Sequence, residues 1–492
     1  MEAFAQAVER VNGVINGMVW GPPMLVLIIS AGIFFTVRTG FFQVRWAKLV
    51  GDLTFFAIFR KKSVRSTKEH KSITQFQALS TALAATIGTG NIAGVATAIS
   101  IGGAGAVFWM WVSAFFGMMT NYAENVLGIY YRKKNVKGEW TGGAMYYIEN
   151  GLGKVGGLSV IAKPLAVIFS IFCVLASFGI GNMTQVNSIA SAMTGSFGVP
   201  AIVTGIFCAF VAGLVIIGGI KRIARVTEHV VPFMAFFYII GAVVIIVLNA
   251  RAVPAVFAQI FSGAFGFRAA AGGFAGAALK QAITMGFKRG VFSNEAGLGS
   301  SVMVHSASDV KEPVIQGMWG IFEVFFDTII VCSLTAFAVL TTGALDSGNT
   351  GVQLVSAAFS HGFGHVAGKF VSLAVLLFAF STVLGWSFYG EKGMEYLFGT
   401  KATIVYKILF VAFIVIGATM NLALAWDISD TLNGLMAIPN LIGVLLLSGT
   451  VMAITKNYLA RKVRRTDVGA EPMLSAYAEI QTMQAAKLGD ED

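Results

Sequence analysis

Eleven apolar segments, each of about 20 residues or more, dominate this sequence. A helix needs about 20 apolar residues to cross the hydrocarbon core of a bilayer. Only 12% of the residues are charged, against roughly 25% in a soluble protein. The pattern predicts an all-α, polytopic protein embedded in a lipid bilayer. The expected spans cover approximately 18–38, 74–101, 104–131, 160–193, 197–218, 228–249, 273–302, 313–343, 366–395, 402–421 and 427–455.

Basic residues gather in one set of loops and are nearly missing from the alternate set. The stretch 38–71 contains nine Lys or Arg and 132–163 contains six, whereas 341–366 contains none. Basic loops remain in the cytoplasm, so we expect the N-terminus outside and the C-terminus inside the cell (inner) membrane. This topology requires an odd number of spans. The basic cytoplasmic loops also account for the net charge of +11, so the charge does not indicate a nucleic-acid partner.

The chain lacks patterns that indicate a metal centre, a disulfide framework or enzyme chemistry. Its three cysteines, Cys173, Cys208 and Cys332, lie inside apolar runs and are expected to be buried thiols. The five histidines do not cluster, and no Cys-x-x-Cys or His-Glu-x-x-His spacing occurs. We therefore expect neither an enzyme nor a bound cofactor.

Two spans are interrupted by glycine and polar residues in matching places. The second contains Gly-Thr-Gly-Asn at 88–91 followed by Gly94, and the seventh is interrupted between Gly286 and Gly297. A helix broken in mid-membrane exposes backbone N–H and C=O groups, which are tolerated only beside a polar cavity or a ligand. Corresponding broken helices in two halves indicate a transporter built from inverted five-helix repeats.

These features predict four parts. An extra N-terminal helix and a basic loop occupy 1–70, the first five-helix repeat 71–250, the second repeat 251–455, and a cytoplasmic tail 456–492.

The first interruption can bind both ends of an amino acid. Backbone N–H groups between Gly88 and Gly90 favour a carboxylate. Carbonyl groups near Ala85 and Gly88 favour Na⁺, and the amide of Asn91 can bind the substrate or the ion. The alternative is that these glycines only allow close packing of helices.

Two other spans offer polar side chains. Gln185 in the fourth span is a candidate substrate contact, although amides also join membrane helices structurally. In the ninth span, Ser381 and Thr382 carry hydroxyl oxygens, which suit a hard cation such as Na⁺. Trp386 shares a helical face with Thr382 and would wall the pocket. The alternative for the hydroxyl groups is hydrogen bonding within their own helix.

Lys288 and Arg289 are adjacent cations inside the seventh span. Such charges are unfavourable in a membrane unless they are paired or hydrated. One interpretation is an inner gate or an anchor for the substrate carboxylate. The other is that the pair lies closer to the cytoplasm and meets water. The candidate partners are Glu124, Glu295, Glu323 and Asp327.

Four blocks of the sequence resemble the alanine or glycine:sodium symporters, also called amino acid carrier proteins. The most specific is Gly-Gly-Ala-Gly-Ala-Val-Phe-Trp-Met-Trp-Val-Ser-Ala-Phe-Phe-Gly at 102–117. Supporting blocks lie at 88–94, 141–147 and 290–297. The resemblance covers roughly residues 15 to 460.

This resemblance implies a leucine-transporter-type fold with one extra N-terminal helix. It also implies sodium-coupled import of alanine or glycine by alternating access. The sequence leaves the oligomeric state open, and a monomer is the default expectation. Phe287 and Val291 would then wall the side-chain pocket. The implied substrate site consists of Gly88, Thr89, Gly90, Asn91, Gln185, Phe287, Val291, Thr382 and Trp386, with Na⁺ near Ala85, Gly88, Asn91, Ser381 and Thr382.

Two rival functions remain open at this point. The same architecture could be driven by protons, and Glu295 is then the candidate titratable carboxylate because it lies close to the second interruption. A channel is the other rival, although the sequence contains no filter-like segment. Uptake measured separately against sodium and pH gradients would distinguish them.

Overall fold

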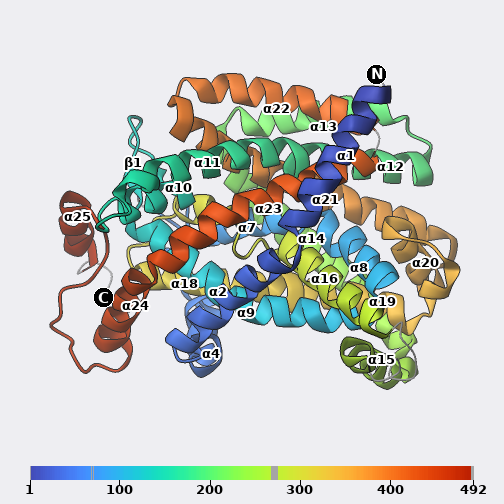
Figure 1. Ribbon diagram of the computed structural model, residues 1–492, viewed down its shortest axis with the longest axis horizontal. Coiled ribbons are helices and arrows are strands. Elements are labelled where there is room, and N and C mark those ends of the chain that lie inside the picture. The colour runs from blue at the N-terminus through green and yellow to red at the C-terminus, as the bar shows by residue number, and fades with distance from the viewer. Residues whose placement is uncertain (1, 68, 70, 267–274, 421, 489–492) are drawn as a thin grey trace.

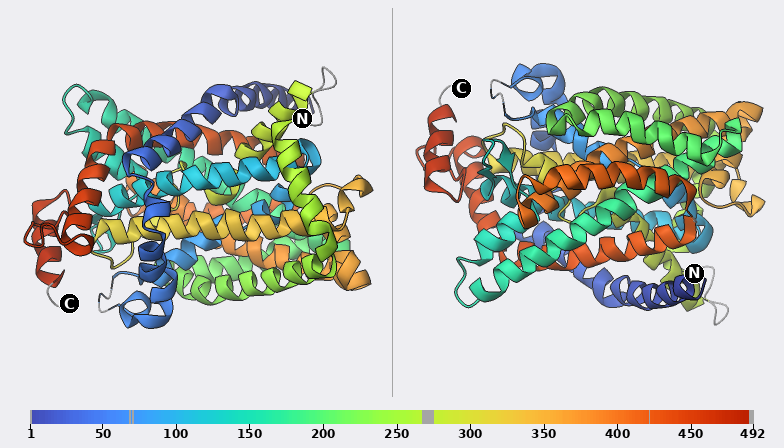
Figure 2. Two further views of the ribbon diagram at one scale, coloured as in Figure 1. Left: turned by 90° about the horizontal axis from the view of Figure 1, so that it is seen from below. Right: turned by 90° about the horizontal axis from the view of Figure 1, so that it is seen from above.

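The computed structural model describes residues 2–67, 69, 71–266, 275–420 and 422–488. They form a bundle of helices that run mostly along its longest axis, with the two chain termini towards opposite ends (Figure 1). One end carries the antiparallel hairpin of β1 (Lys133–Lys134) and β2 (Trp140–Thr141), together with α25 (Ala478–Leu488). We call this the tail end, and both turned views show it opposite the N-terminus (Figure 2).

The chain begins with α1 (Glu2–Val19) and α2 (Pro22–Arg38). Proline at the start of α2 suits a first helical turn, whose N–H groups have no partner within the helix. α1 packs on α23 (Leu422–Leu446), and α2 packs on α9 (Gly105–Tyr130). Four short helices follow α2: α3 (Phe42–Arg45), α4 (Ala47–Leu53), α5 (Phe55–Arg60) and α6 (Lys62–Arg65).

The next part of the chain contains the first broken helix. α7 begins with a capping box, in which the side chains of Thr74 and Gln77 each bond the other's backbone N–H. Besides α9, this part comprises α7 (Gln75–Thr86), the π-helix η1 (Gly90–Gly94), α8 (Val95–Gly102), α10 (Ala144–Tyr147), η2 (Ile148–Leu152), α11 (Ser159–Phe178), η3 (Gly179–Met183), α12 (Thr184–Phe197), α13 (Ala201–Ile216) and α14 (Gly219–Leu248).

The remaining part contains the second broken helix and the C-terminal helices. Besides α23 and α25, it comprises η4 (Ala250–Ala252), α15 (Val253–Phe265), α16 (Ala275–Asn294), α17 (Val302–His305), α18 (Pro313–Val324), the π-helix η5 (Phe325–Cys332), α19 (Ser333–Thr341), η6 (Ala344–Ser347), α20 (Gly351–Phe363), η7 (Gly364–Val366), α21 (Ala367–Phe398), α22 (Ala402–Thr419), α24 (Ser448–Tyr458) and η8 (Leu459–Val463).

The two halves of the chain are packed into one another rather than side by side. α9 packs on both α16 and α18, α13 packs on α22, and α11 and α12 both pack on α21. Helices from both halves therefore surround the middle of the bundle. The boundaries of the two repeats remain a prediction.

Seven helical segments of the described chain are long and apolar enough to cross a membrane, or eight if the bent pair of 75–86 and 90–102 is one span. The other three expected spans coincide with α9, α13 and α16. α13 has only 16 residues, and α9 carries a polar face with Asn121, Glu124 and Asn125. The all-α polytopic class is thus confirmed, while the count of eleven spans stays a prediction.

The outer surface of the bundle is strongly apolar. Large side chains such as Phe207 on α13, Phe236 on α14 and Ile408 on α22 are each more than 60% exposed. A soluble protein rarely exposes apolar patches of this extent. Polar and charged side chains such as Asn91, Glu323 and Asp327 are instead fully buried. This inversion is what a bilayer requires, because lipid offers no hydrogen bonds.

Candidate functional site

The first helix break lies where the Gly-rich motif predicts it. α7 ends at Thr86, and the helical segments on either side of the break differ in direction by 50°. A Cβ atom added at Gly88 would lie 2.4 Å from Oγ1 of Thr382. The absence of a side chain at Gly88 therefore allows α21 to approach the broken backbone closely.

Two N–H groups in this break are held by side-chain oxygens. Gly88 N–H donates to Oδ1 of Asn91 (3.0 Å), and Thr89 N–H donates to Oε1 of Gln185 (3.3 Å). The buried Thr89 hydroxyl has no hydrogen-bond partner among the described residues. The side-chain amide oxygens of Asn91 and Gln185 thus accept from the two backbone N–H groups that could otherwise donate to a carboxylate. The arrangement is therefore suited to binding a carboxylate.

The second break begins later than the sequence analysis expected. α16 is continuous through Gly286 and Gly290 and ends at Asn294. Both glycines serve close packing, since a Cβ at Gly286 would lie 2.6 Å from the Ala106 carbonyl oxygen of α9. The expected interruption between Gly286 and Gly297 is therefore wrong as far as Asn294, and the break covers 295–301, before α17.

Glu295 turns the chain out of α16. Its φ is +56°, the left-handed region that residues other than glycine rarely adopt. Asn294 supports the turn, because its Oδ1 accepts the Ala296 N–H at 3.1 Å. Oε1 of Glu295 accepts the indole N–H of Trp386 (2.7 Å), and Oε2 accepts the hydroxyl of Ser300. The carboxylate of Glu295 is thus held in one orientation.

Both breaks meet at one central cavity of about 10 Å³, which is room for about one water molecule. Gly90 packs directly on Phe292 and Ser293. This state of the protein is closed around the cavity. The cavity is lined by Ala85, Thr86, Gly88, Gly90, Ile180, Gln185, Phe292, Glu295, Thr382 and Trp386.

Six residues of the predicted substrate and sodium sites line this cavity, and five do not. Phe287 packs against Trp109 instead, with ring centroids 5.9 Å apart, and Val291 is buried one turn before Glu295. Because α16 continues to Asn294, the ring that reaches the cavity belongs to Phe292. Sequence reasoning missed Phe292 and considered Glu295 only as a charge partner or a proton carrier. The predicted residues outside the lining are Thr89, Asn91, Phe287, Val291 and Ser381.

Asn91 does not line the cavity, and its amide nitrogen points to Asp327 of η5. Its amide donates to Oδ1 of Asp327 at 2.6 Å, and the Asp327 carboxylate also accepts from Ser293 (2.8 Å) and Thr328 (2.8 Å). Ser293 belongs to α16, so this cluster joins the two broken helices. Asn91 therefore links the Gly88 N–H at one end of its side chain to a buried carboxylate at the other.

The hydroxyl groups of Ser381 and Thr382 lie against the end of α7. Both donate to the Phe378 carbonyl of their own helix, at 2.8 and 3.0 Å. They also approach the carbonyl oxygens of Ala84 (3.3 Å) and Ile87 (3.5 Å), respectively. Two hydroxyl and three carbonyl oxygens, all of them neutral, therefore lie beside the first break. Such hard oxygen ligands suit an alkali or alkaline-earth cation.

Lys288 and Arg289 pair with Asp430 of α23, which is not among the four candidate partners. The ammonium of Lys288 lies 2.8 Å from Oδ2, and the Arg289 guanidinium lies 3.4 Å from Oδ1. Neither basic residue pairs with Glu295. The two cations lie before the break on α16, away from the tail end. None of the four candidate partners is used, and the role of the pair as a gate or as an anchor for the substrate carboxylate stays a prediction.

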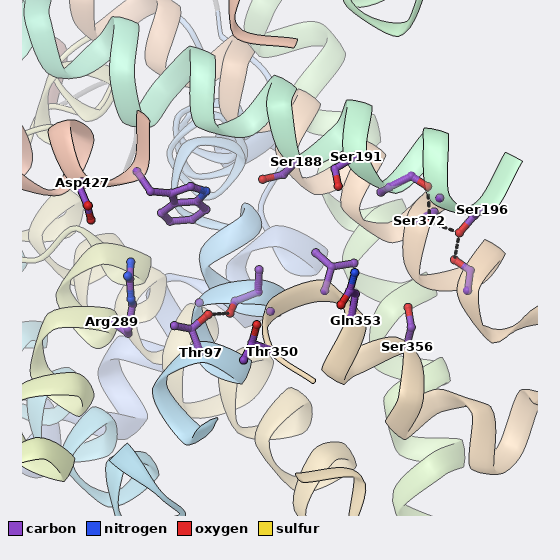
Figure 3. A pocket seen from close by; sticks show the side chains of 18 residues that line it. Thr97, Ser188, Ser191, Ser196, Arg289, Thr350, Gln353, Ser356, Ser372 and Asp427 are labelled. Atoms are coloured by element: carbon purple, nitrogen blue, oxygen red, sulfur yellow. Dashed lines mark hydrogen bonds between the residues drawn. The ribbon is translucent and has the colours of Figure 1, made fainter. Parts of the chain in front are cut away.

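A cavity of about 960 Å³ lies on that side of the break, and we call it the vestibule. Arg289 and Asp427 stand at one side of it, and Ser196 and Ser372 at the other (Figure 3). Trp426 also lines the vestibule. Its ring stacks on that of Phe292, with centroids 5.2 Å apart, and Phe292 lines the central cavity. The stacked pair therefore separates the two cavities.

Comparisons with known proteins agree with this architecture. The model of the sodium:alanine symporter family matches residues 5–471. The sodium/alanine symporter AgcS of Methanococcus maripaludis is 49% identical over 456 residues, covering 92% of this chain and 97% of the relative. The probable sodium/glutamine symporter GlnT of Bacillus subtilis is 38% identical, covering 93% and 92%.

The solved structure of MhsT in complex with L-phenylalanine has a TM-score of 0.54 at 14% identity, covering 85% of this chain and 97% of MhsT. This likeness identifies the fold as the leucine-transporter type. The family comprises symporters, so the protein is a multi-pass membrane transporter and not an enzyme. A match along nearly the whole length of this chain means that it belongs to the sodium:alanine symporter family.

Proposed function

We propose that the protein is a sodium-coupled symporter that imports small neutral amino acids, alanine and glycine first, by alternating access across the cell membrane. The observation that carries the proposal is the meeting of two broken helices at one closed polar cavity, beside a larger vestibule. A transporter of this kind must expose its site to one side of the membrane at a time.

The proposed orientation follows from the basic loops. The stretch 38–71, the hairpin β1–β2 and the tail beyond 456 carry many Lys and Arg residues and gather towards the tail end. The positive-inside rule places such loops in the cytoplasm. The vestibule would then open to the outside, and substrate would enter past Arg289 and Trp426.

The substrate carboxylate would bind at the first break. There it would replace the amide oxygens of Asn91 and Gln185 on the N–H groups of Gly88 and Thr89. Oriented backbone N–H groups need no reorganisation to receive an anion, which favours binding. Asn91 also ties the break to Asp327, and Gln185 lines the cavity, so Asn91→Ala and Gln185→Ala should abolish alanine uptake in protein that still folds.

Sodium would bind beside α7, among the hydroxyl oxygens of Ser381 and Thr382 and the nearby main-chain carbonyls. Thr382 touches both regions, because its hydroxyl lies against the position of Gly88. An ion there would hold the broken backbone in place for the carboxylate. Coupling between the two ligands must be reciprocal, so sodium should tighten alanine binding by the same factor as alanine tightens sodium binding.

The proposed preference for amino acids with small side chains follows from the residues that line the cavity. Phe292, Trp386 and Ile180 surround a space of about 10 Å³, so even a methyl side chain requires the walls to move apart. A larger side chain would overpack the site, which typically costs about 1–3 kcal/mol. Phe287 and Val291, on the stretch of α16 that leads to the cavity, would bound the site once it enlarges.

The test is uptake of labelled alanine and glycine into proteoliposomes that contain the purified protein. An inward sodium gradient should drive accumulation above the external concentration, and an equal potassium gradient should not. Accumulation driven by a proton gradient without sodium would replace sodium coupling with proton coupling. Equilibration without accumulation would indicate a channel and overturn the proposal.

A further inference from the structure

Glu295 is the one ionisable side chain among the ten residues that line the central cavity. The others are glycine, alanine, threonine, isoleucine, glutamine, phenylalanine and tryptophan. The side chain of Glu295 is 98% buried. The cavity therefore carries one carboxyl group, at the end of α16, and shares its lining with Gly88 of the α7 break.

No basic residue of the described chain pairs with this carboxyl group. Lys288 and Arg289, the nearest cations along the sequence, both pair with Asp430. The partners of Glu295 are the neutral groups of Trp386 and Ser300. A carboxylate buried with neutral donors alone is unfavourable, and a cationic ligand in the cavity would relieve this.

The local backbone aims the carboxylate at this position. Glu295 adopts a left-handed conformation directly after the last turn of α16. Strained backbone of this kind persists where the surrounding structure holds it and is concentrated at ligand sites. The indole of Trp386 and the hydroxyl of Ser300 each take one carboxylate oxygen. Each oxygen still has a lone pair for a further donor.

We propose that Glu295 binds the α-ammonium group of the transported amino acid. The proposal rests on the proposed function, because it names what holds the second charged end of that substrate. An amino acid carries its carboxylate and its ammonium on the same carbon atom. The N–H groups of Gly88 and Thr89 would take the carboxylate, and Glu295, across the narrow cavity, would take the ammonium. Specificity for α-amino acids then follows from these two opposed walls.

The first test uses the unmodified protein and ligand analogues. Labelled alanine is bound to purified protein in detergent with sodium present, and unlabelled competitors are added. Glycine should compete well. Lactate replaces the ammonium with a hydroxyl group and propionate with hydrogen, so both should compete at least about 100-fold more weakly than alanine. Competition by lactate at concentrations close to those of alanine would overturn the proposal.

The second test is Glu295→Gln, which keeps the shape and removes the charge. Alanine affinity should fall roughly 10- to 100-fold, because a hydrogen bond to a charged group contributes more than a neutral one. Asp52→Asn is the matched control, since Asp52 is a surface carboxylate that pairs with Arg60 at 3.5 Å. The control should bind alanine as the unmodified protein does.

Three further outcomes distinguish a failure of the Glu295 proposal from a failure of the proposed function. If Glu295→Gln binds alanine normally but uptake loses its pH dependence, Glu295 carries a coupling proton and the proposal is wrong. If the Gln variant does not fold, the analogue competition still decides. If the unmodified protein does not bind alanine, the choice of substrate in the proposed function fails. The same tests then apply to whichever amino acid it binds, because every α-amino acid carries the ammonium group.

Discussion

Phe292 and Trp426 stack ring on ring, with centroids 5.2 Å apart and planes inclined by 27°. One ring faces the central cavity and the other faces the vestibule. The guanidinium of Arg289 lies 5.4 Å from both ring centroids, a distance at which a cation is attracted to an aromatic face. The stack and the cation together form a partition between the central cavity and the vestibule.

Removing the Phe292 ring should open this partition. The three native cysteines are buried, so a cysteine introduced as Thr86→Cys in the central cavity can be followed with a water-soluble thiol reagent. We expect Thr86→Cys to react slowly alone and at least about tenfold faster with Phe292→Ala, because water then reaches the cavity from the vestibule. Phe236→Ala, which removes a ring exposed on the outer surface, is the control. Equal rates in all three proteins would contradict the partition.

Asp430 should be important for stability. Its side chain is 1% exposed and neutralises two cations that are 14% and 11% exposed. Asp430→Asn leaves both cations without a carboxylate, and breaking a buried pair in this way typically costs about 3–5 kcal/mol. We expect a lower free energy of unfolding, measured as a fall in the apparent Tm in detergent. Asp427→Asn, which removes a more exposed carboxylate on the same helix, should change the Tm little.

Gly88 should not tolerate a side chain. A Cβ there would lie 2.4 Å from the Thr382 hydroxyl and 3.2 Å from the Gln185 amide oxygen. Gly88→Ala must push α21 or α12 away from the break, so we expect uptake to fall roughly tenfold or more. Gly17→Ala has open space around it and should transport normally. Unchanged uptake by Gly88→Ala at matched expression would argue against close packing at this position.

The C-terminal tail should stay docked across the physiological pH range. Glu69 in the loop before α7 pairs with Lys487 of α25. Partial burial acts to raise the pKa of Glu69, but hydrogen bonds from Lys487, Ser72 and Trp140 outweigh it and hold the pKa at about 2, below the usual 4.5. A depressed carboxyl pKa stabilises the docked state above pH 4.5, and this contribution is lost only as the pH falls towards 2.

Hydrogen exchange of α25 measures this docking. Between pH 8 and 5, protection of the α25 amides, corrected for intrinsic exchange rates, should not change, because Glu69 stays ionised. Glu69→Gln should lower the protection at pH 7. A loss of protection in the unmodified protein between pH 7 and 5 would mean that another group controls the tail.

The membrane class and the first break could be predicted from sequence because both depend on local composition. Long apolar runs are incompatible with water. In the Gly-Thr-Gly-Asn motif at 88–91, all four residues lower the stability of a regular helix. The second break was misplaced because glycine serves two purposes in membrane helices. Gly286 and Gly290 allow α9 to approach, whereas the chain leaves the helix at Glu295, a residue without helix-breaking character.

By itself, then, the sequence determined that the chain is a polytopic membrane protein, which loops are basic and which residues are candidates for a polar site, since each follows from neighbours along the chain. Which buried side chains pair with one another was decided only by the tertiary structure. Asp430 lies 141 residues from Arg289, and Trp386 lies 91 residues from Glu295. Several buried charges and donors compete for each such contact. Only the packing of the two halves determines which groups come within hydrogen-bonding distance.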